Sequence, residues 1–195
     1  MDINSPHTVD RDVPEMQKAN PVTTDCDEYL YCGLPYIVPV LTMIWKTHWL
    51  PGPAPNIITP VNMTVIKRET ISSGERIILK VEGPTHIGVI ISPMEGIELT
   101  SWSLKTQYPL AGPKWKGRKT YFIYYAYGLN PVPLVFHMDF KVPSIYKGPI
   151  LDLAVTSHYL FGKGKASSTL KHLVAQFPPW TAVTYWTATY DSWII

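Results

Sequence analysis

Two apolar runs between Lys119 and Val142 constrain the fold of this chain more than any other feature. The first reads KTYFIYYAYG (119–128) and the second LVFHMDFKV (134–142), with a Pro-containing connection between them. Tyr, Phe, Ile and Val suit a pleated, half-buried sheet. The second run alternates in part, with Leu134, Phe136, Met138 and Phe140 on one face and Val135, His137, Asp139 and Lys141 on the other. This period of two predicts an apolar face on a core, and we expect the two runs to form an antiparallel hairpin at the centre of a β-sandwich.

Further strands follow from similar runs before and after this hairpin. Alternating or continuously apolar stretches predict strands over residues 61–69, 75–82, 86–92, 97–104, 149–160 and 180–195. A different period appears at Leu170, Leu173, Val174 and Phe177, which form one stripe of an amphipathic helix. Ser167 or Ser168 can cap this helix, and Pro178-Pro179 ends it. The sequence therefore predicts an all-β, antiparallel β-sandwich with one short C-terminal helix, with Ig-like or jelly-roll-like connectivity both open.

Composition divides the chain and excludes some classes of protein. Residues 1–24 are polar and lack periodicity, which predicts a flexible arm or linker, and residues 25–195 would form the sandwich domain. A hydrophobic content of 46% is ample for a core, while a net charge of +2, with dispersed Lys and Arg, gives no case for nucleic acid. The apolar window at 36–45 is too short to cross a membrane and is broken by Pro39, and the polar N-terminus does not read as a secretory signal.

Two features are compatible with an oxidising, secretory environment: a pair of cysteines and one N-glycosylation sequon. Cys26 and Cys32 are the only cysteines, and they could form a disulfide, remain as two buried thiols, or act as weak metal ligands. Asn62-Met63-Thr64 is a valid N-glycosylation sequon, although a single triplet also arises by chance.

Weak motifs for catalysis or metal binding are better explained structurally. His137-Met138-Asp139 has the spacing of a zinc ligand pair, but no adjacent acidic pair completes a peptidase site. His86 and His158 could join His137 in a three-histidine site, although hydrogen-bonded histidines at a sandwich rim are the favoured interpretation. We therefore expect no catalytic and no metal-binding residues in this chain.

Two further features of the sequence could bind a ligand. The segment from Gly162 to Ser167 (GKGKAS) has some likeness to a phosphate loop, but it lacks the spacing and carries Ala166 where a magnesium-binding Ser or Thr is needed. A capped strand-to-helix turn explains it better. Several tryptophans could form a stacking platform for sugars or peptides, although aromatic residues on sandwich strands are more often core: Trp102, Trp115, Trp180, Trp186 and Trp193.

Several segments, taken in order, resemble one known family. They are YLYCGLPYIVPV (29–40), VEGPTHIGVIIS (81–92), TSWSL (100–104), YFIYYAYGL (121–129), SHYLFG (157–162), LKHLVAQFPPWT (170–181) and the closing TYDSWII (189–195). In this order they resemble the C-terminal luminal region of the endoplasmic reticulum metallopeptidase family. That family combines a zinc aminopeptidase-type domain, several membrane helices and a luminal β-rich domain.

The resemblance implies what composition leaves open. It implies a position in the endoplasmic reticulum lumen as part of a membrane protein, with a Cys26–Cys32 disulfide, a usable sequon at Asn62 and targeting helices upstream of Met1. The implied function is a non-catalytic domain that stabilises or regulates the peptidase or recruits partners. Its partners would be the peptidase and membrane regions of the parent chain, with luminal proteins as further candidates. Zinc would belong to the peptidase domain of the family, with no cofactor in this chain. The alternative is a stand-alone carbohydrate- or protein-binding β-sandwich module.

Overall fold

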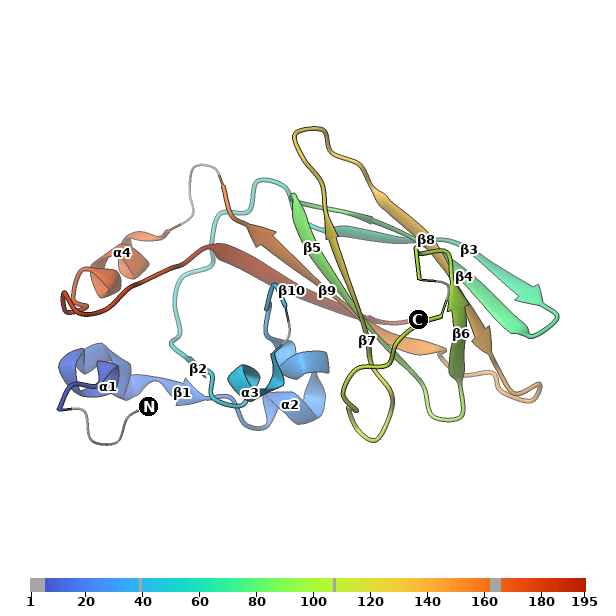
Figure 1. Ribbon diagram of the computed structural model, residues 1–195, viewed down its shortest axis with the longest axis horizontal. Coiled ribbons are helices and arrows are strands. Elements are labelled where there is room, and N and C mark those ends of the chain that lie inside the picture. Colours follow the sequence, from blue (N-terminus) through green and yellow to red (C-terminus); the bar gives the residue numbers. More distant parts are fainter. Residues whose placement is uncertain (1–5, 39, 107, 162–165) are drawn as a thin grey trace.

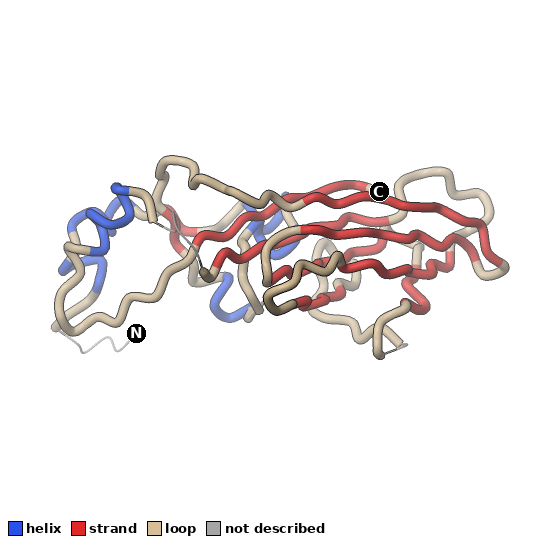
Figure 2. The backbone as a smooth tube through the Cα atoms, turned by 90° about the horizontal axis from the view of Figure 1, so that it is seen from above, coloured by secondary structure: helices blue, strands red, loops and turns tan. Residues whose placement is uncertain are grey.

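Two antiparallel sheets form the body of the protein in the computed structural model, which describes residues 6–38, 40–106, 108–161 and 166–195 (Figures 1 and 2). Sheet I has the strand order β3 (Asn62–Ile71), β4 (Gly74–Glu82), β8 (Leu134–Lys141), β6 (Glu98–Trp102). Sheet II has the order β10 (Thr187–Ile194), β9 (Leu151–Tyr159), β5 (His86–Pro93), β7 (Tyr121–Ala126). Apolar side chains from both sheets fill one core between them. The prediction of an all-β sandwich with a short C-terminal helix is confirmed.

The expected hairpin between the two central runs is wrong. β7 is an edge strand of sheet II and pairs with β5, whereas β8 lies inside sheet I between β4 and β6. The connection from Tyr127 to Pro133 therefore crosses from one sheet to the other. Both runs do direct an apolar face into the shared core, for example Ile123 from β7 and Met138 from β8. Alternation specifies which face is buried, but it does not specify the pairing partner.

The faces of β8 follow the predicted alternation with one exception. Leu134, Phe136, Met138 and Phe140 are buried, and Val135 and Lys141 are exposed. Asp139 was expected to face solvent and is instead 8% exposed. Its burial is possible because Arg76, directly opposite on β4, supplies a compensating charge.

β5 is apolar from Ile87 to Ile91 because both of its faces are covered. Val89 and Ile91 point into the core between the sheets, whereas Ile90 packs in a second cluster on the outer face of sheet II, beside Ala154 of β9. A strand buried on both sides has no polar face to present, and its sequence shows none.

The turn between β3 and β4 depends on Gly74. This residue has φ of +144°, and a Cβ placed on it would lie 2.1 Å from the carbonyl oxygen of Phe140. The turn at Ser72-Ser73-Gly74 is thus built around the close approach of Gly74 to β8.

A group of short elements precedes the sandwich, and the part of it from Val22 to Ile44 packs on the outer face of sheet II. They are α1 (Val9–Asp12), η1 (Pro14–Lys18), β1 (Asn20–Pro21), α2 (Asp25–Glu28), η2 (Leu30–Gly33), α3 (Leu41–Ile44) and β2 (His48–Trp49). β1 pairs with β2, and Val13 and Val22 are buried. The predicted arm at 1–24 thus carries short helices in its described part, and the division into arm and domain stays a prediction. We call residues 20–38 and 40–49 the cap.

The C-terminal helix forms as α4 (Ser168–Val174), with Ser167 as its N-cap accepting the backbone N–H of Leu170 at 3.1 Å. Its apolar stripe is half-buried, and Leu170 and Leu173 line a cavity with the segment from Leu50 to Pro55. The helix lies with α1 at the end of the molecule away from sheet I (Figure 1). The final strand is shorter than predicted and covers only 187–194. Within the described residues, no helix has the length and apolar character needed to cross a bilayer.

Candidate functional site

The cap is organised by a disulfide. Cys26 in α2 and Cys32 in η2 are bonded, as the resemblance implied. Between them the chain reverses sharply, and Tyr31, Cys32 and Gly33 have φ of +48°, +60° and +68°. Non-glycine residues rarely adopt this left-handed conformation, so the disulfide and the surrounding packing hold the reversal in place.

Three side-chain hydrogen bonds tie the cap to the sandwich. Tyr190 of β10 donates its hydroxyl to the carbonyl of Leu30 at 2.9 Å, and Trp115 donates its indole N–H to the carbonyl of Cys26 at 2.9 Å. The hydroxyl of Tyr31 lies 3.2 Å from that of Thr120. The cap is therefore attached to β10 and to the loop before β7.

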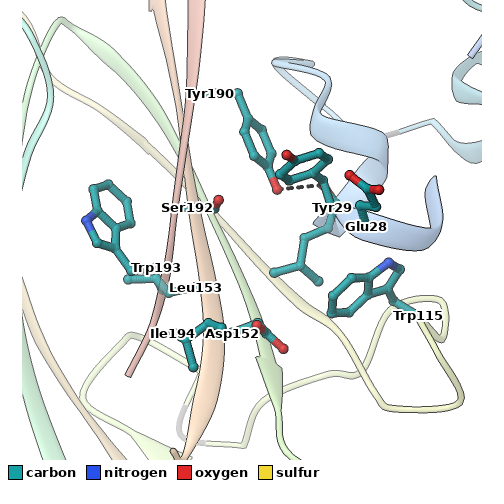
Figure 3. A pocket seen from close by; sticks show the side chains of 10 residues that line it. Glu28, Tyr29, Trp115, Asp152, Leu153, Tyr190, Ser192, Trp193 and Ile194 are labelled. Carbon is teal, nitrogen blue, oxygen red and sulfur yellow. Dashed lines mark hydrogen bonds between the residues drawn. The ribbon is translucent and has the colours of Figure 1, made fainter. Parts of the chain in front are cut away.

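A groove runs between the cap and the outer face of sheet II (Figure 3). One cavity of about 270 Å³ is lined by Glu28, Tyr29, Leu30, Trp115, Asp152, Leu153, Tyr190, Ser192, Trp193 and Ile194. A second cavity of about 400 Å³ lies beside the disulfide and shares Tyr29, Tyr190 and Ser192 with the first. Ser192 and Ile194 form the floor, while Tyr29 and Trp115 face them from the cap and the loop (Figure 3). Since β10 is an edge strand, the groove lies along an open sheet edge.

Charges in the groove are partly paired. Arg118 donates to the carboxylate of Asp152 at 2.5 Å and lies 4.8 Å from the ring centre of Trp115. Glu28 is exposed on the opposite wall. Burial raises the pKa of Tyr190, with further contributions from Asp152 and Tyr29, so this hydroxyl remains a neutral donor at physiological pH. The groove therefore exposes the ring of Tyr29 and the carboxylate of Glu28, whereas the carboxylate of Asp152 is already paired with Arg118.

Comparison with known proteins assigns the family. Residues 1–193 match the family described as endoplasmic reticulum metallopeptidase 1, C-terminal domain. The chain belongs to this family. Over 184 residues, it is 29% identical to endoplasmic reticulum metallopeptidase 1 of Homo sapiens and 27% identical to the proteins of that name from Rattus norvegicus and Mus musculus. These alignments cover 93% of the chain and 20% of each relative, so the chain spans about a fifth of their length. No solved structure matches.

Asp139, the acidic residue of the His137-Met138-Asp139 motif, makes structural hydrogen bonds. Two hydrogen bonds from Arg76, at 2.6 and 2.9 Å, and one from Ser101, at 2.9 Å, occupy the carboxylate of Asp139. The Arg76 hydrogen bonds, opposed by burial and helped by Ser101, hold the pKa of Asp139 below its ordinary value. Asp139 therefore serves as the anionic centre of a cross-strand network.

The three histidines considered as a metal site are not brought together. His86 and His158 are opposite each other on β5 and β9, whereas His137 lies in sheet I. His158 is fully buried and accepts a hydrogen bond from the indole of Trp186 at 3.2 Å, so it is hydrogen-bonded as expected but lies deeper than a sandwich rim. Within the described ranges, no group of three or more His, Cys, Asp or Glu side chains is placed to hold a metal ion.

The five tryptophans differ in exposure, and of them Trp115 and Trp193 line the first cavity. Trp102 is buried, Trp115 and Trp193 are half-buried, and Trp180 and Trp186 are exposed. The ring of Trp115 also carries the ammonium of Lys116, 4.5 Å from its centre, besides Arg118. A sugar needs a free aromatic face on which to stack, which this ring does not offer cleanly.

The remaining predicted residues are Asn62, the loop at 162–165 and Ser167. Asn62 lies exposed at the start of β3, with its amide 3.5 Å from Glu82, and glycosylation there stays a prediction. The loop at 162–165 lies outside the described residues, and Ser167 is the helix cap. Sequence reasoning missed the groove, because its lining comes from α2, η2, the loop around Trp115, β9 and β10. Only the tertiary fold brings these segments together.

Replacing both Cys26 and Cys32 with serine should loosen the cap while the sandwich stays folded. The loop that they close is short, so the chain-entropy contribution is about 2 kcal/mol, and it applies to a segment with left-handed backbone at Tyr31. Hydrogen exchange should show faster exchange at residues 20–35 and unchanged exchange in β5 and β9. The wild-type chain with reductant is the matched control and should behave like the double variant. Equal protection of the cap in all samples would contradict a stabilising role for the disulfide.

Proposed function

We propose that this chain is a non-catalytic luminal domain of an endoplasmic reticulum membrane zinc metallopeptidase, where it stabilises or regulates the peptidase or recruits partners. The observation that carries the proposal is the contrast between two sets of side chains. The best candidates for chemistry, Asp139 and His158, are held by Arg76, Ser101 and Trp186 inside the fold. The groove beside β10, in contrast, presents aromatic and carboxylate groups to solvent.

The luminal position is supported by the Cys26–Cys32 disulfide. Disulfides persist in the oxidising lumen and are rare in the cytosol. In this proposal Asn62, exposed on the first strand of sheet I, carries a glycan. An immunoblot of membrane and soluble fractions tests both points. We expect a membrane-bound band far larger than 22.1 kDa that shifts after endoglycosidase treatment. A soluble, unshifted band near that mass would contradict the proposal and favour the stand-alone binding module.

The groove suggests how the domain contacts the rest of the parent chain. Ser192 is exposed, lies on the groove floor and lines both cavities, so Ser192→Trp should fill the groove without entering the core. In the full-length membrane protein, this variant should lower peptidase abundance or peptide cleavage by about tenfold, since a blocked interface commonly costs more than 1 kcal/mol. Val135→Trp, an exposed outward position on β8, is the matched control and should have no such effect.

Two results would overturn the proposed role. The first is that deleting residues 25–195 from the parent protein leaves its abundance, cleavage rate and bound partners unchanged. The second is that the purified chain alone binds zinc tightly and cleaves peptides. Either result would remove the assignment of a non-catalytic domain that acts on a separate peptidase.

A further inference from the structure

The free edge of β10 presents backbone groups without a partner in the described part of the chain. The amide of Ile195 donates to the carbonyl of Leu151 at 2.9 Å, and the amide of Leu151 donates back to Ile195 at 3.1 Å. Because antiparallel residues alternate between hydrogen-bonded and non-hydrogen-bonded pairs, every second residue before Ile195 also bonds to β9. The residues between them turn their N–H and C=O groups to the open edge: Tyr190, Ser192 and Ile194.

The edges of sheet I carry features that discourage pairing, and the edge at β10 does not. β3 has a bulge between Val65 and Lys67, and β6 has only five residues and a bulge between Leu99 and Ser101. Bulges and short edge strands are means by which proteins prevent pairing with another chain. The register of β10 with β9 is continuous over all eight residues of the strand. β7 is also regular, but none of its residues lines the groove.

The groove beside β10 carries unpaired negative charge. The residues that line its two cavities include Asp25, Glu28 and Asp152 but no Lys or Arg. Arg118 neutralises Asp152, whereas neither Asp25 nor Glu28 forms an ion pair with another described residue. Lys116, held over an indole ring in the loop before β7, adds one positive charge beside the first cavity. The side of the groove formed by α2 therefore favours a cationic partner.

A strand added to β10 would place some of its side chains in this groove. Residues directly opposite each other in an antiparallel pair direct their side chains to the same face of the sheet. Ser192 lies on the groove floor, across from Tyr29 (Figure 3). A Lys or Arg opposite Ser192 would thus lie on the groove side, where its aliphatic stem can pack on Tyr29 and its charge can approach Glu28.

We propose that β10 binds an extended, basic peptide segment of another protein, which adds to sheet II as a further antiparallel strand. Main-chain hydrogen bonds to Ser192 and its edge neighbours would supply affinity, and a Lys or Arg in the groove would supply specificity. A second copy of this chain fits less well, because β10 itself contains Asp191 and no Lys or Arg to place against the carboxylates. This partner chemistry rests on the proposed function, in which the domain recruits partners.

Fluorescence anisotropy with the full 195-residue chain and labelled octapeptides tests the proposal. The probe peptide alternates lysine and threonine, and its length matches the eight residues of β10. We expect saturable binding at about 0.15 M salt. The same peptide with glutamate in place of lysine should bind at least about tenfold more weakly, because the groove carboxylates repel it.

Methylated peptides separate strand addition from simple charge attraction. With a lysine opposite Ser192, the lysine amides of the probe face β10 and the threonine amides face away. N-methylation of the lysine amides should therefore weaken binding about tenfold or more, and N-methylation of the threonine amides should have little effect. In NMR spectra, the peptide should slow hydrogen exchange at the amides of Ser192 and Ile194 and leave the amide of Trp193 unchanged, since Trp193 already bonds to β9.

Variants of the chain test the same contacts from the other side. Ser192→Pro removes a donor at the open edge without removing a bond to β9, so it should lower affinity for the basic peptide about tenfold, whereas Ser192→Ala should bind as the wild type does. Glu28→Lys should weaken binding about fivefold or more. Its matched control is Glu95→Lys, an equal change of charge at an exposed position outside the groove lining, which should have no effect. If Ser192→Pro misfolds, the methylated peptides test the backbone contacts on the wild-type chain.

Several outcomes would overturn the inference. They are the absence of binding by the basic peptide, equal binding of the two methylated peptides, or an unchanged affinity in folded Ser192→Pro. A dimer in sedimentation velocity that Ser192→Pro disperses would assign the open edge to a second copy of the chain instead. The proposed function would fail separately, in the immunoblot of the parent protein or in the deletion of residues 25–195.

Discussion

Replacing Phe140 with alanine should lower the free energy of unfolding by about 4 kcal/mol, because the change removes a fully buried aromatic ring and leaves a cavity. Phe140 lies on β8, opposite Glu75 of β4 and Leu99 of β6, and its side chain packs between the sheets. Relaxation around the cavity is restricted, since the backbone of Gly74 already lies against the carbonyl of Phe140. Urea unfolding followed by far-UV circular dichroism measures the loss.

A surface substitution provides the comparison for Phe140→Ala. Leu129 is 102% exposed in the connection between β7 and β8, so Leu129→Ala should change the free energy of unfolding by less than about 0.5 kcal/mol. A loss below about 1 kcal/mol for Phe140→Ala would mean that this ring is not in a close-packed core. The same loss for both variants would contradict the assignment of the buried face of β8.

The fold class could be predicted because burial leaves a pattern in the sequence. Leu134 to Phe140 alternate, and the structure buries the predicted face. Pairing leaves no such pattern, because a strand with one apolar face can join any neighbour that buries the same face. The runs at 121–126 and 134–141 were adjacent in sequence and were predicted to pair, yet they joined opposite sheets.

The burial of polar residues could not be predicted for the same reason. Asp139 reads as a solvent-facing position in the alternation, and its burial depends on Arg76, which is 63 residues away in sequence. That charge pair could be predicted only from the β4–β8 register. The groove required still more, because it depends on how the cap lies on sheet II, including the hydrogen bond between Tyr190 and Leu30 across 160 positions.

His158 illustrates how burial makes a side chain sensitive to pH. Its Nδ1 accepts the indole N–H of Trp186, so the neutral ring carries its proton on Nε2. A second proton would place a positive charge inside sheet II, opposite His86. Burial therefore lowers the pKa of His158 from 6.5 to about 4, with attraction to the Tyr36 backbone opposing the shift and His86 adding to it.

Acidification should consequently destabilise the protein between pH 6.5 and about 4. In this window the unfolded chain binds a proton at His158 and the folded chain does not, so stability is fully present above pH 6.5 and falls as the pH drops. The loss approaches roughly 3 kcal/mol at the lower end of the window. Asp139 affects stability in a lower pH range, because its pKa in the folded protein lies below its unfolded value of 3.8.

The pH dependence can be assigned to His158 by removing its titration. Urea unfolding at pH 7.5 and 4.5 should show a wild-type loss of roughly 2 to 3 kcal/mol, whereas His158→Gln should lose far less over the same interval. The variant is expected to be less stable than the wild type at pH 7.5, because glutamine does not fill the histidine site. The comparison therefore uses the change in unfolding free energy between the two pH values and not its absolute value. An unchanged slope in His158→Gln would place the titrating group elsewhere. It would also mean that His158 is accessible to water in the folded protein. The contact between His158 and Trp186 would then open in solution.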